Sequence, residues 1–266
     1  MKKLVIALTA VAAFTGSASA ADLGARPYTK APVAAPVAYN WTGCYVAGGG
    51  GYGWYTAETR QVSPVTGAAL FNQGDTGGKG WMGQGQVGCD YQFAGPLGNW
   101  VIGAFGDYTF SDVKGDHVGP NFTTTVGTLT QDYNWAVGGR IGYVVNPTFL
   151  TYFSAGYTEG HFEQTNYNRF VNLAVAGNPG TALPGSTHKG WFLGSGFEYG
   201  LGFLPGLFLK SEYRYSEFDR KQLNNFTVAT GLPTGTAETV KPFTQSVITS
   251  LVYRFNWTGT PVVAKY

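Results

Sequence analysis

Residues 190–218 read GWFLGSGFEYGLGFLPGLFLKSEYRYSEF and contain two strand-like segments around a turn. The turn signal is GFLPG at residues 202–206, a spacing that predicts a hairpin. Successive side chains of a strand point to opposite faces, so one face of this hairpin is apolar and the other is glycine-rich or charged. The apolar face holds Trp191, Leu193, Phe197, Tyr199, Leu207, Leu209, Tyr213 and Tyr215, and the charges are Glu198, Lys210, Glu212 and Arg214.

The composition indicates which face meets water. Only 12% of the 266 residues are charged, about half the share of a soluble domain, whereas glycine (40 residues) and aromatic residues (16%) are abundant. So few charges are difficult to reconcile with a water-exposed surface but natural for a face in hydrocarbon. The formal net charge is +2, and no basic run is interleaved with aromatic residues, so we expect no nucleic-acid partner.

The N-terminus has the pattern of an export signal. Lys2 and Lys3 precede an apolar run at residues 4–14, and Ala18-Ser19-Ala20 supplies a cleavage site. We therefore predict a cleaved signal peptide at residues 1–20. Residues 21–40 are rich in Ala and Pro, have no periodicity and are predicted to be a periplasmic linker.

From residue 41 onward, alternating segments are separated in turn by short and long connections. The predicted strands are 42–56, 80–93, 100–110, 132–145, 149–159, 190–201, 207–218 and 243–255. The long polar connections are 57–78, 111–131, 160–189 and 219–242, and the short turns are 94–99, 146–148 and 202–206. Both termini fall on the side of the short turns.

This plan is typical of an outer-membrane barrel rather than of a secreted β-sandwich, whose strands are usually shorter and less regularly connected. We predict an all-β fold: an eight-stranded antiparallel transmembrane β-barrel with four long extracellular loops and short periplasmic turns. The barrel is assigned to residues 41–257 and a C-terminal tail to 258–266. Aromatic residues on both faces leave the facing of the fifth strand open.

Aromatic residues cluster near both ends of the strands, as expected for two membrane–water interfaces. The turn-side cluster is predicted to contain Trp41, Phe93, Trp100, Phe149 and Phe203, and the loop-side cluster Trp54, Trp81, Phe110, Trp135, Trp191 and Tyr215.

The charged positions predicted to face the lumen are the candidate functional site. They are Asp90, Asp107, Arg140, Glu198, Lys210, Glu212, Arg214 and Arg254. Such charges can form a selective pore or a self-neutralising network. The interior of an eight-stranded barrel is only wide enough for side chains to fill, and buried charges are tolerated when paired, so the pattern favours a plugged lumen.

The two cysteines, Cys44 and Cys89, fall on adjacent predicted strands and on the same face. An exported chain meets an oxidising compartment, so a cross-strand disulfide is one interpretation. The other is two small apolar residues whose Cβ directions do not permit a bond.

The sequence contains only weak motifs for catalysis or metal binding. His117, His161 and His188 fall in loops or at a loop margin, without ligand spacing to another His or to Cys. Ser186 and His188 are compatible with a nucleophile and its base but are commoner as solvated loop residues. We predict no enzyme activity, no metal and no cofactor.

Several motifs together resemble one family. They are Asp22-Leu23, PYTKAP (27–32), NWTG (40–43), GGYGW (50–54), RIGY (140–143), Gly190-Trp191, Glu198-Tyr199, EYRY (212–215), LVYRF (251–255) and PVVAKY (261–266). The chain resembles the outer-membrane immunogenic proteins of alpha-proteobacteria, which are porin-family, opacity-like small barrels. It departs from them at Cys44, where the family usually has an aromatic residue. The resemblance implies an eight-stranded barrel and surface antigenicity, and no catalytic residues.

The sequence thus predicts an integral Gram-negative outer-membrane protein with a structural, envelope-integrity and antigenic role. The rival functions are a small-solute porin, a loop-mediated adhesin or haem-binding receptor and, least favoured, a lipid-modifying enzyme. Expected partners are outer-membrane lipid, lipopolysaccharide and the barrel-assembly machinery.

Overall fold

The computed structural model describes residues 40–119, 125–171 and 174–255, which form one antiparallel sheet of eleven strands. The strands are β1 (Gly43–Val62), β2 (Ala69–Gly95), β3 (Gly98–Val118), β4 (Thr125–Asn146), β5 (Phe149–Phe162), β6 (Thr165–Val171), β7 (Ala174–Leu183), β8 (Ser186–Gly200), β9 (Leu207–Phe218), β10 (Lys221–Thr227) and β11 (Pro233–Phe255). In these ranges no helix is long and apolar enough to cross a membrane. The predicted signal peptide 1–20, the linker up to residue 39 and the tail 258–266 lie outside the described residues.

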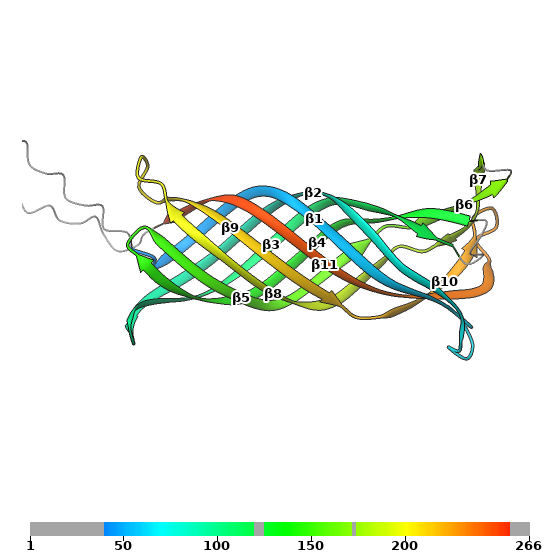
Figure 1. The fold of residues 1–266 in the computed structure, drawn as a ribbon, viewed down its shortest axis with the longest axis horizontal. Helices are drawn as coiled ribbons and strands as arrows, with labels where there is room; N and C mark the ends of the chain where they lie inside the picture. Colours follow the sequence, from blue (N-terminus) through cyan, green and yellow to red (C-terminus); the bar gives the residue numbers. More distant parts are fainter. Residues whose placement is uncertain (1–39, 120–124, 172–173, 256–266) are drawn as a thin grey trace, which may run out of the picture. The chain divides into compact units, whose positions relative to one another are not determined.

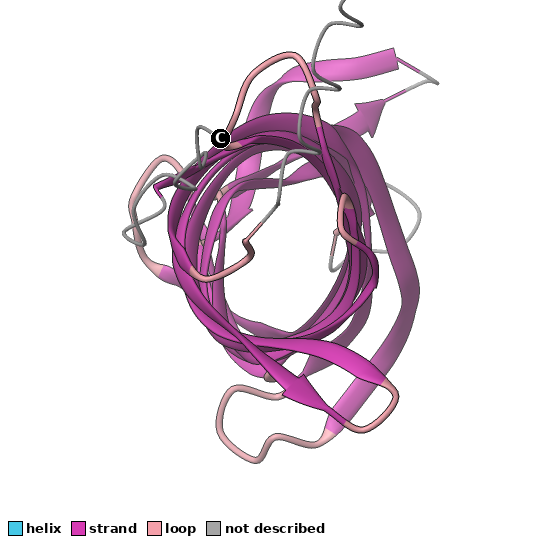
Figure 2. Ribbon diagram, turned by 90° about the vertical axis from the view of Figure 1, so that its left-hand side faces the viewer, coloured by secondary structure: helices cyan, strands magenta, loops and turns pink. Residues whose placement is uncertain are grey.

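Eight of the strands close into a ring. Neighbours pair in the order β1-β2-β3-β4-β5-β8-β9-β11, and β11 pairs back with β1. The view along the ring shows this closure directly (Figure 2). The prediction of an all-β antiparallel barrel is therefore confirmed.

The prediction of four long polar loops was wrong for most of their residues. β1 continues to Val62 and β2 begins at Ala69, while β3 and β4 reach Val118 and Thr125. Residues 160–189 and 219–242 contain β6, β7, β10 and the first part of β11. Stretches rich in polar residues such as Thr and Asn are typical of loops. Here their backbone N–H and C=O groups form the hydrogen bonds of the strand ladder.

β6, β7 and β10 form what we call the outer extension. Two-residue breaks separate β5 from β6, β7 from β8 and β9 from β10: Glu163-Gln164, Pro184-Gly185 and Asp219-Arg220. Beyond the breaks, β6, β7 and β10 pair in the order β11-β10-β7-β6-β4 and so take the places of β5, β8 and β9 in the wall. The barrel wall is thereby prolonged at the end opposite the short turns (Figure 1).

Glycine permits the close approach of β1 and β11 at the seam. Their register runs from Cys44 opposite Phe255 to Val62 opposite Ala237. A Cβ atom on Gly51 would lie 1.9 Å from the Val247 carbonyl oxygen, which no side chain can tolerate. Gly49 and Gly51 are therefore packing requirements of the seam.

Along each strand of the ring, side chains alternate between the outer face of the barrel and the lumen. On β5, whose facing the sequence left open, Phe153 is 70% exposed and points outward, whereas Tyr152 is 2% exposed and points inward. We call Trp54, Trp81, Phe110, Trp135, Trp191 and Tyr215 the loop-end girdle, and Phe93, Trp100 and Phe149 the turn-end girdle. Trp41 does not belong to the turn-end girdle as predicted, because it is fully buried.

The lumen is filled by side chains rather than open. One apolar cluster, which includes Trp41, Tyr45 and Phe208, lies toward the turn end, and a second, which includes Tyr55 and Phe162, lies toward the outer extension. Between these two clusters lies a polar cavity of about 10 Å³. It has about the space of one water molecule.

Candidate functional site

All eight charged residues predicted for the lumen lie inside the barrel and are at most 7% exposed. They come from six strands: Asp90 from β2, Asp107 from β3, Arg140 from β4, Glu198 from β8, Lys210, Glu212 and Arg214 from β9, and Arg254 from β11. The structure brings them together in two groups of four.

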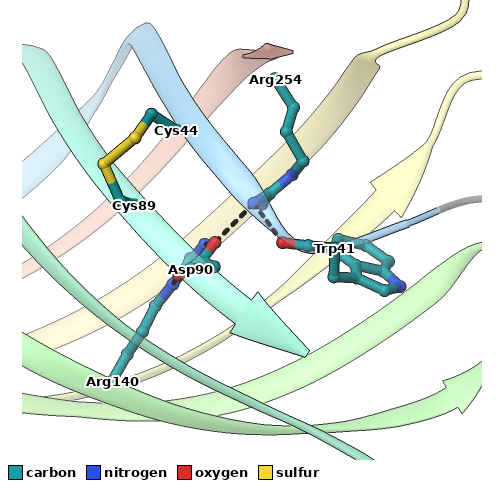
Figure 3. The surroundings of a disulfide bond; sticks show 6 residues. All are labelled: Trp41, Cys44, Cys89, Asp90, Arg140 and Arg254. Carbon is teal, nitrogen blue, oxygen red and sulfur yellow. Dashed lines mark hydrogen bonds and ion pairs between the residues drawn. A yellow bond between two sulfur atoms is a disulfide. The ribbon is translucent and has the colours of Figure 1, made fainter. Parts of the chain in front are cut away.

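The first group, which we call the turn-end quartet, comprises Asp90, Arg140, Glu198 and Arg254. Arg140 Nε lies 2.9 Å from Asp90 Oδ1, and Arg140 Nη1 lies 2.5 Å from Glu198 Oε1. Arg254 completes the cycle, with Nη1 2.6 Å from Asp90 Oδ2 and Nη2 2.9 Å from Glu198 Oε2. Each guanidinium thus bridges both carboxylates, and Figure 3 shows the half of the cycle around Asp90.

The second group, the central quartet, comprises Asp107, Lys210, Glu212 and Arg214. Arg214 binds Asp107 through two parallel hydrogen bonds of 3.0 and 2.8 Å and donates from Nε to Glu212 Oε1 at 2.9 Å. Lys210 Nζ lies 3.9 Å from Glu212 Oε2. Two neutral groups complete the network: Lys210 donates to Gln86 Oε1, and Tyr152 donates to Glu212 Oε2 at 2.8 Å.

Aromatic rings fill the space around the guanidinium groups. Arg140 Cζ lies 4.8 Å from the ring centroid of Tyr45 and 5.0 Å from that of Tyr152. Arg214 Cζ lies 4.4 Å from the ring of Phe192 and 5.7 Å from that of Phe105. These contacts explain why Phe105, which interrupts the alternation of β3, points inward: its ring is a cation–π partner of Arg214.

Trp41 closes the lumen at the turn end. Its carbonyl oxygen accepts a hydrogen bond of 2.8 Å from Arg254 Nη1, as Figure 3 shows. Its ring lies 4.8 Å from the ring of Phe208, and Arg254 Cζ lies 5.4 Å from the Trp41 ring. The residue just before β1 therefore belongs to the lumen packing.

This arrangement is better suited to filling the barrel than to selecting ions. Each quartet contains two cations and two anions and has no net charge. An unpaired buried charge costs several kcal/mol, so each member depends on its partners being present. A hollow of about 820 Å³ does exist, but apolar side chains such as Ile102, Ile141 and Phe153 line it on the outer face of the barrel.

A disulfide joins Cys44 on β1 to Cys89 on β2, which are register partners. The bond lies on the outer face, one residue from the inward-pointing Asp90 (Figure 3). It therefore links the start of β1 to the strand that supplies a carboxylate of the turn-end quartet.

We predict that denatured, unreduced protein resists alkylation by a maleimide reagent. Both cysteines are held in the disulfide, so no thiolate is present to react. Intact mass spectrometry before and after reduction checks this: two adducts should form only after reduction. Two adducts without reductant would show that the bond is absent.

A further polar cluster, not predicted from the sequence, lies in the outer part of the barrel. We call it the Glu238 cluster: Glu238, His117, Tyr167, Asn225 and Thr76. Glu238 accepts hydrogen bonds from Tyr167 (2.9 Å) and Asn225 (2.8 Å), and its Oε2 lies 3.0 Å from His117 Nε2. The other ring nitrogen, Nδ1, lies 2.9 Å from Thr76 Oγ1.

The Glu238 cluster links the outer extension to the ring, because Tyr167 and Asn225 come from β6 and β10. All three side chains that surround the carboxylate are fully buried. Burial, together with the Glu238 carboxylate, raises the pKa of Tyr167 well above its usual range. The sequence did not predict this cluster because the polar stretches that contain its residues have the composition of loops. Weak alternation around Glu238 and His117 is the signal that could have indicated it.

The three histidines occupy different positions. His161 Nδ1 lies 2.7 Å from Asp132 Oδ1 at the partly exposed surface, and His117 belongs to the Glu238 cluster. His188 is fully buried and lies 2.9 Å from Ser186 Oγ, so the interpretation of this residue as a solvated loop histidine was wrong. Among the described residues, no group of three or more His, Cys, Asp or Glu is placed to hold a metal ion.

A family profile described as "Outer membrane protein beta-barrel domain" matches residues 6–255. The chain belongs to this family. Members are outer-membrane β-barrels, so the family assignment agrees with the closed antiparallel ring.

Similar solved structures are remote in sequence. The Escherichia coli outer-membrane protease OmpT is 10% identical, with a TM-score of 0.47 and coverage of 83% of this chain and 99% of that one. OprG from Pseudomonas aeruginosa is 13% identical, with a TM-score of 0.47 and coverage of 83% and 100%. Neisserial surface protein A is 15% identical, with a TM-score of 0.35 and coverage of 80% and 98%. No curated protein matches the sequence.

Proposed function

We propose that the protein is a non-conducting barrel of the Gram-negative outer membrane with a structural, envelope-integrity and antigenic role. The observation that carries this proposal is the lumen: two neutral quartets, the aromatic rings around them and the buried Trp41 fill its turn-end half. The outer extension would then stand at the cell surface as a strand-built projection.

The outer surface of the ring supports a membrane-spanning position. On the described strands, the outward positions between the two girdles carry no Asp, Glu, Lys or Arg. Surface ion pairs begin just beyond the loop-end girdle, for example Lys241–Glu217 (2.6 Å) and Lys114–Asp112 (2.6 Å). Aromatic girdles at headgroup level with charges beyond them are the pattern of a barrel in lipid.

Within this proposal, the signal peptide 1–20 directs export and is cleaved, and residues 21–40 form a periplasmic linker. Lipopolysaccharide and the barrel-assembly machinery are its proposed partners. The subgroup is that of the immunogenic, opacity-like small barrels. A small-solute porin is less well supported because the paired charges leave a cavity of only about 10 Å³ between the apolar clusters.

We predict that the purified protein produces no reproducible open-channel steps in planar bilayers. The buried quartets obstruct the lumen, and moving them apart would leave charges unpaired. Vesicles made from the same preparation serve as the control: protection of the ring from protease shows that the barrel has inserted. Large, reproducible conductance steps from inserted protein would favour the porin instead.

A further inference from the structure

The barrel wall is split where the outer extension begins. The β8–β9 ladder ends at Gly190 opposite Phe218, and pairing resumes only at Ala182 of β7 opposite Phe226 of β10. Between these points the strands are linked by one backbone hydrogen bond, from the Asp219 N–H to the Lys189 carbonyl (2.7 Å), and by side chains. Lys221 Nζ donates to the Thr187 carbonyl, and His188 Nδ1 lies 3.0 Å from the Asp219 carbonyl oxygen.

Ser186, His188 and the Asp219 carbonyl form a hydrogen-bonded relay in this split. The Asp219 carbonyl can only accept, so His188 Nδ1 carries the proton and Nε2 has a free lone pair. Ser186 Oγ lies 2.9 Å from that nitrogen and can only donate to it. A hydroxyl, an unprotonated imidazole nitrogen and a group that fixes the tautomer are the parts of an activated nucleophile.

The surroundings favour the same protonation state. Burial lowers the pKa of His188, so the imidazole is neutral at pH 7. His188 lies beyond Trp191 of the loop-end girdle, on the side of the outer extension. The buried His188 is screened from water, whereas Ser186 is half-buried and so within reach of a reagent.

Two groups are placed to stabilise negative charge beside Ser186. The ammonium of Lys221 is held against the carbonyl of Thr187, the residue that follows Ser186. The N–H and C=O of a strand residue lie on the same edge, so the Thr187 N–H also faces the split. An N–H after the nucleophile and a nearby cation are suitable donors for an oxyanion.

We propose that Ser186 is a nucleophile activated by His188 and that the split is an acyl-transfer site for carboxylic esters presented at the membrane surface. Ser186 Oγ attacks the ester carbonyl carbon as its proton passes to His188 Nε2. The bond to the alcohol oxygen then breaks, and the alcohol takes that proton. Water, deprotonated by His188, attacks the acyl-serine, releases the carboxylic acid and restores the Ser186 hydroxyl. The site lies beyond the two quartets on which the proposed function rests, where the His188 ring packs edge-on against Phe162 at 5.6 Å.

Labelling with a biotinylated fluorophosphonate tests the nucleophile in the full-length folded protein. Ser186 Oγ should displace fluoride from phosphorus, and peptide mass spectrometry should place the adduct on Ser186. Ser186→Ala should abolish labelling, and His188→Gln should slow it by roughly 100-fold or more, since general-base assistance contributes at least that factor. Hydrolysis of p-nitrophenyl butyrate should fall in parallel.

Ser63→Ala is the matched control, because Ser63 lies at the β1–β2 tip without a histidine partner. This variant should label at the wild-type rate, and electrophoretic mobility without heating verifies that every variant is folded. Equal labelling of wild type and Ser186→Ala, or an adduct on Ser63 but not on Ser186, overturns the proposal.

The pH dependence separates general-base activation from simple accessibility. The reactive form has a neutral imidazole, and the pKa of His188 is lowered from 6.5. The labelling rate of wild type should therefore stay constant from pH 8 to pH 6.5 and fall only at more acidic pH. A rate that rises tenfold per pH unit across this range would mean that hydroxide acts as the base and would refute the role of His188.

Discussion

Replacing Glu198 with Gln should lower the free energy of unfolding by about 3–5 kcal/mol, the range seen when one partner of a buried ion pair is removed. The substitution keeps the size of the side chain but removes the charge that both Arg140 and Arg254 contact. Two guanidinium groups would then share the single carboxylate of Asp90. Equilibrium urea unfolding in lipid vesicles, followed by tryptophan fluorescence, measures the loss.

Glu217→Gln is the matched control for this prediction. Glu217 also accepts from a cation, Lys241 Nζ at 2.6 Å, but both side chains are 27% exposed. Exposed pairs contribute about 0–1 kcal/mol, so the control should unfold near the wild-type midpoint. Equal, small losses in the two variants would show that the turn-end quartet is hydrated and contributes little.

Replacing Glu238 with Ala should loosen the outer extension while the ring stays folded. His117, Tyr167 and Asn225 would each lose a buried hydrogen-bond partner. We expect a local loss of at least about 3 kcal/mol, or a hundredfold or more in amide protection, since bonds to charged groups contribute about 1.5–3 kcal/mol each. Hydrogen–deuterium exchange of β6 and β10 should therefore accelerate, while β9 should remain protected.

Asp116→Asn provides the comparison, because Asp116 is the exposed neighbour of His117 on β3. It removes the same charge from the same part of the barrel without touching the Glu238 cluster. Its exchange profile should match that of the wild type. Uniform acceleration over the whole barrel in Glu238→Ala would instead mean that the outer extension and the ring unfold as one unit.

Strand facing could be predicted from the sequence because it depends on a period of two. The alternation of Lys210, Glu212 and Arg214 with Leu209, Tyr213 and Tyr215 is sufficient to place each set on one side of β9. The bounds of β9, from Leu207 to Phe218, were predicted for the same reason. The low charge content then indicated which side faces lipid.

Partners and strand ends could not be predicted in this way. The link between Arg254 and Asp90 depends on the register of strands far apart in the sequence, which periodicity does not encode. The outer extension was missed because its strands lack an alternation of apolar and polar residues: β10 reads KQLNNFT and β7 reads AVAGNPGTAL. Trp41 was misplaced because a single residue before the first strand has no period from which to infer its direction.

The cyclic contacts of the turn-end quartet have a consequence for the order of assembly. Its four members come from β2, β4, β8 and β11, and Arg254 is 213 positions from Trp41, which it also binds. Until β11 is in place, Asp90 and Glu198 have Arg140 as their only cation in the quartet. The turn end of the lumen also lacks Arg254, whose guanidinium binds the Trp41 carbonyl. The turn-end quartet therefore becomes electrically neutral only when the last strand meets the first. A chain truncated before Arg254 would keep an excess negative charge in its interior, and this excess would distinguish an unfinished barrel from a finished one.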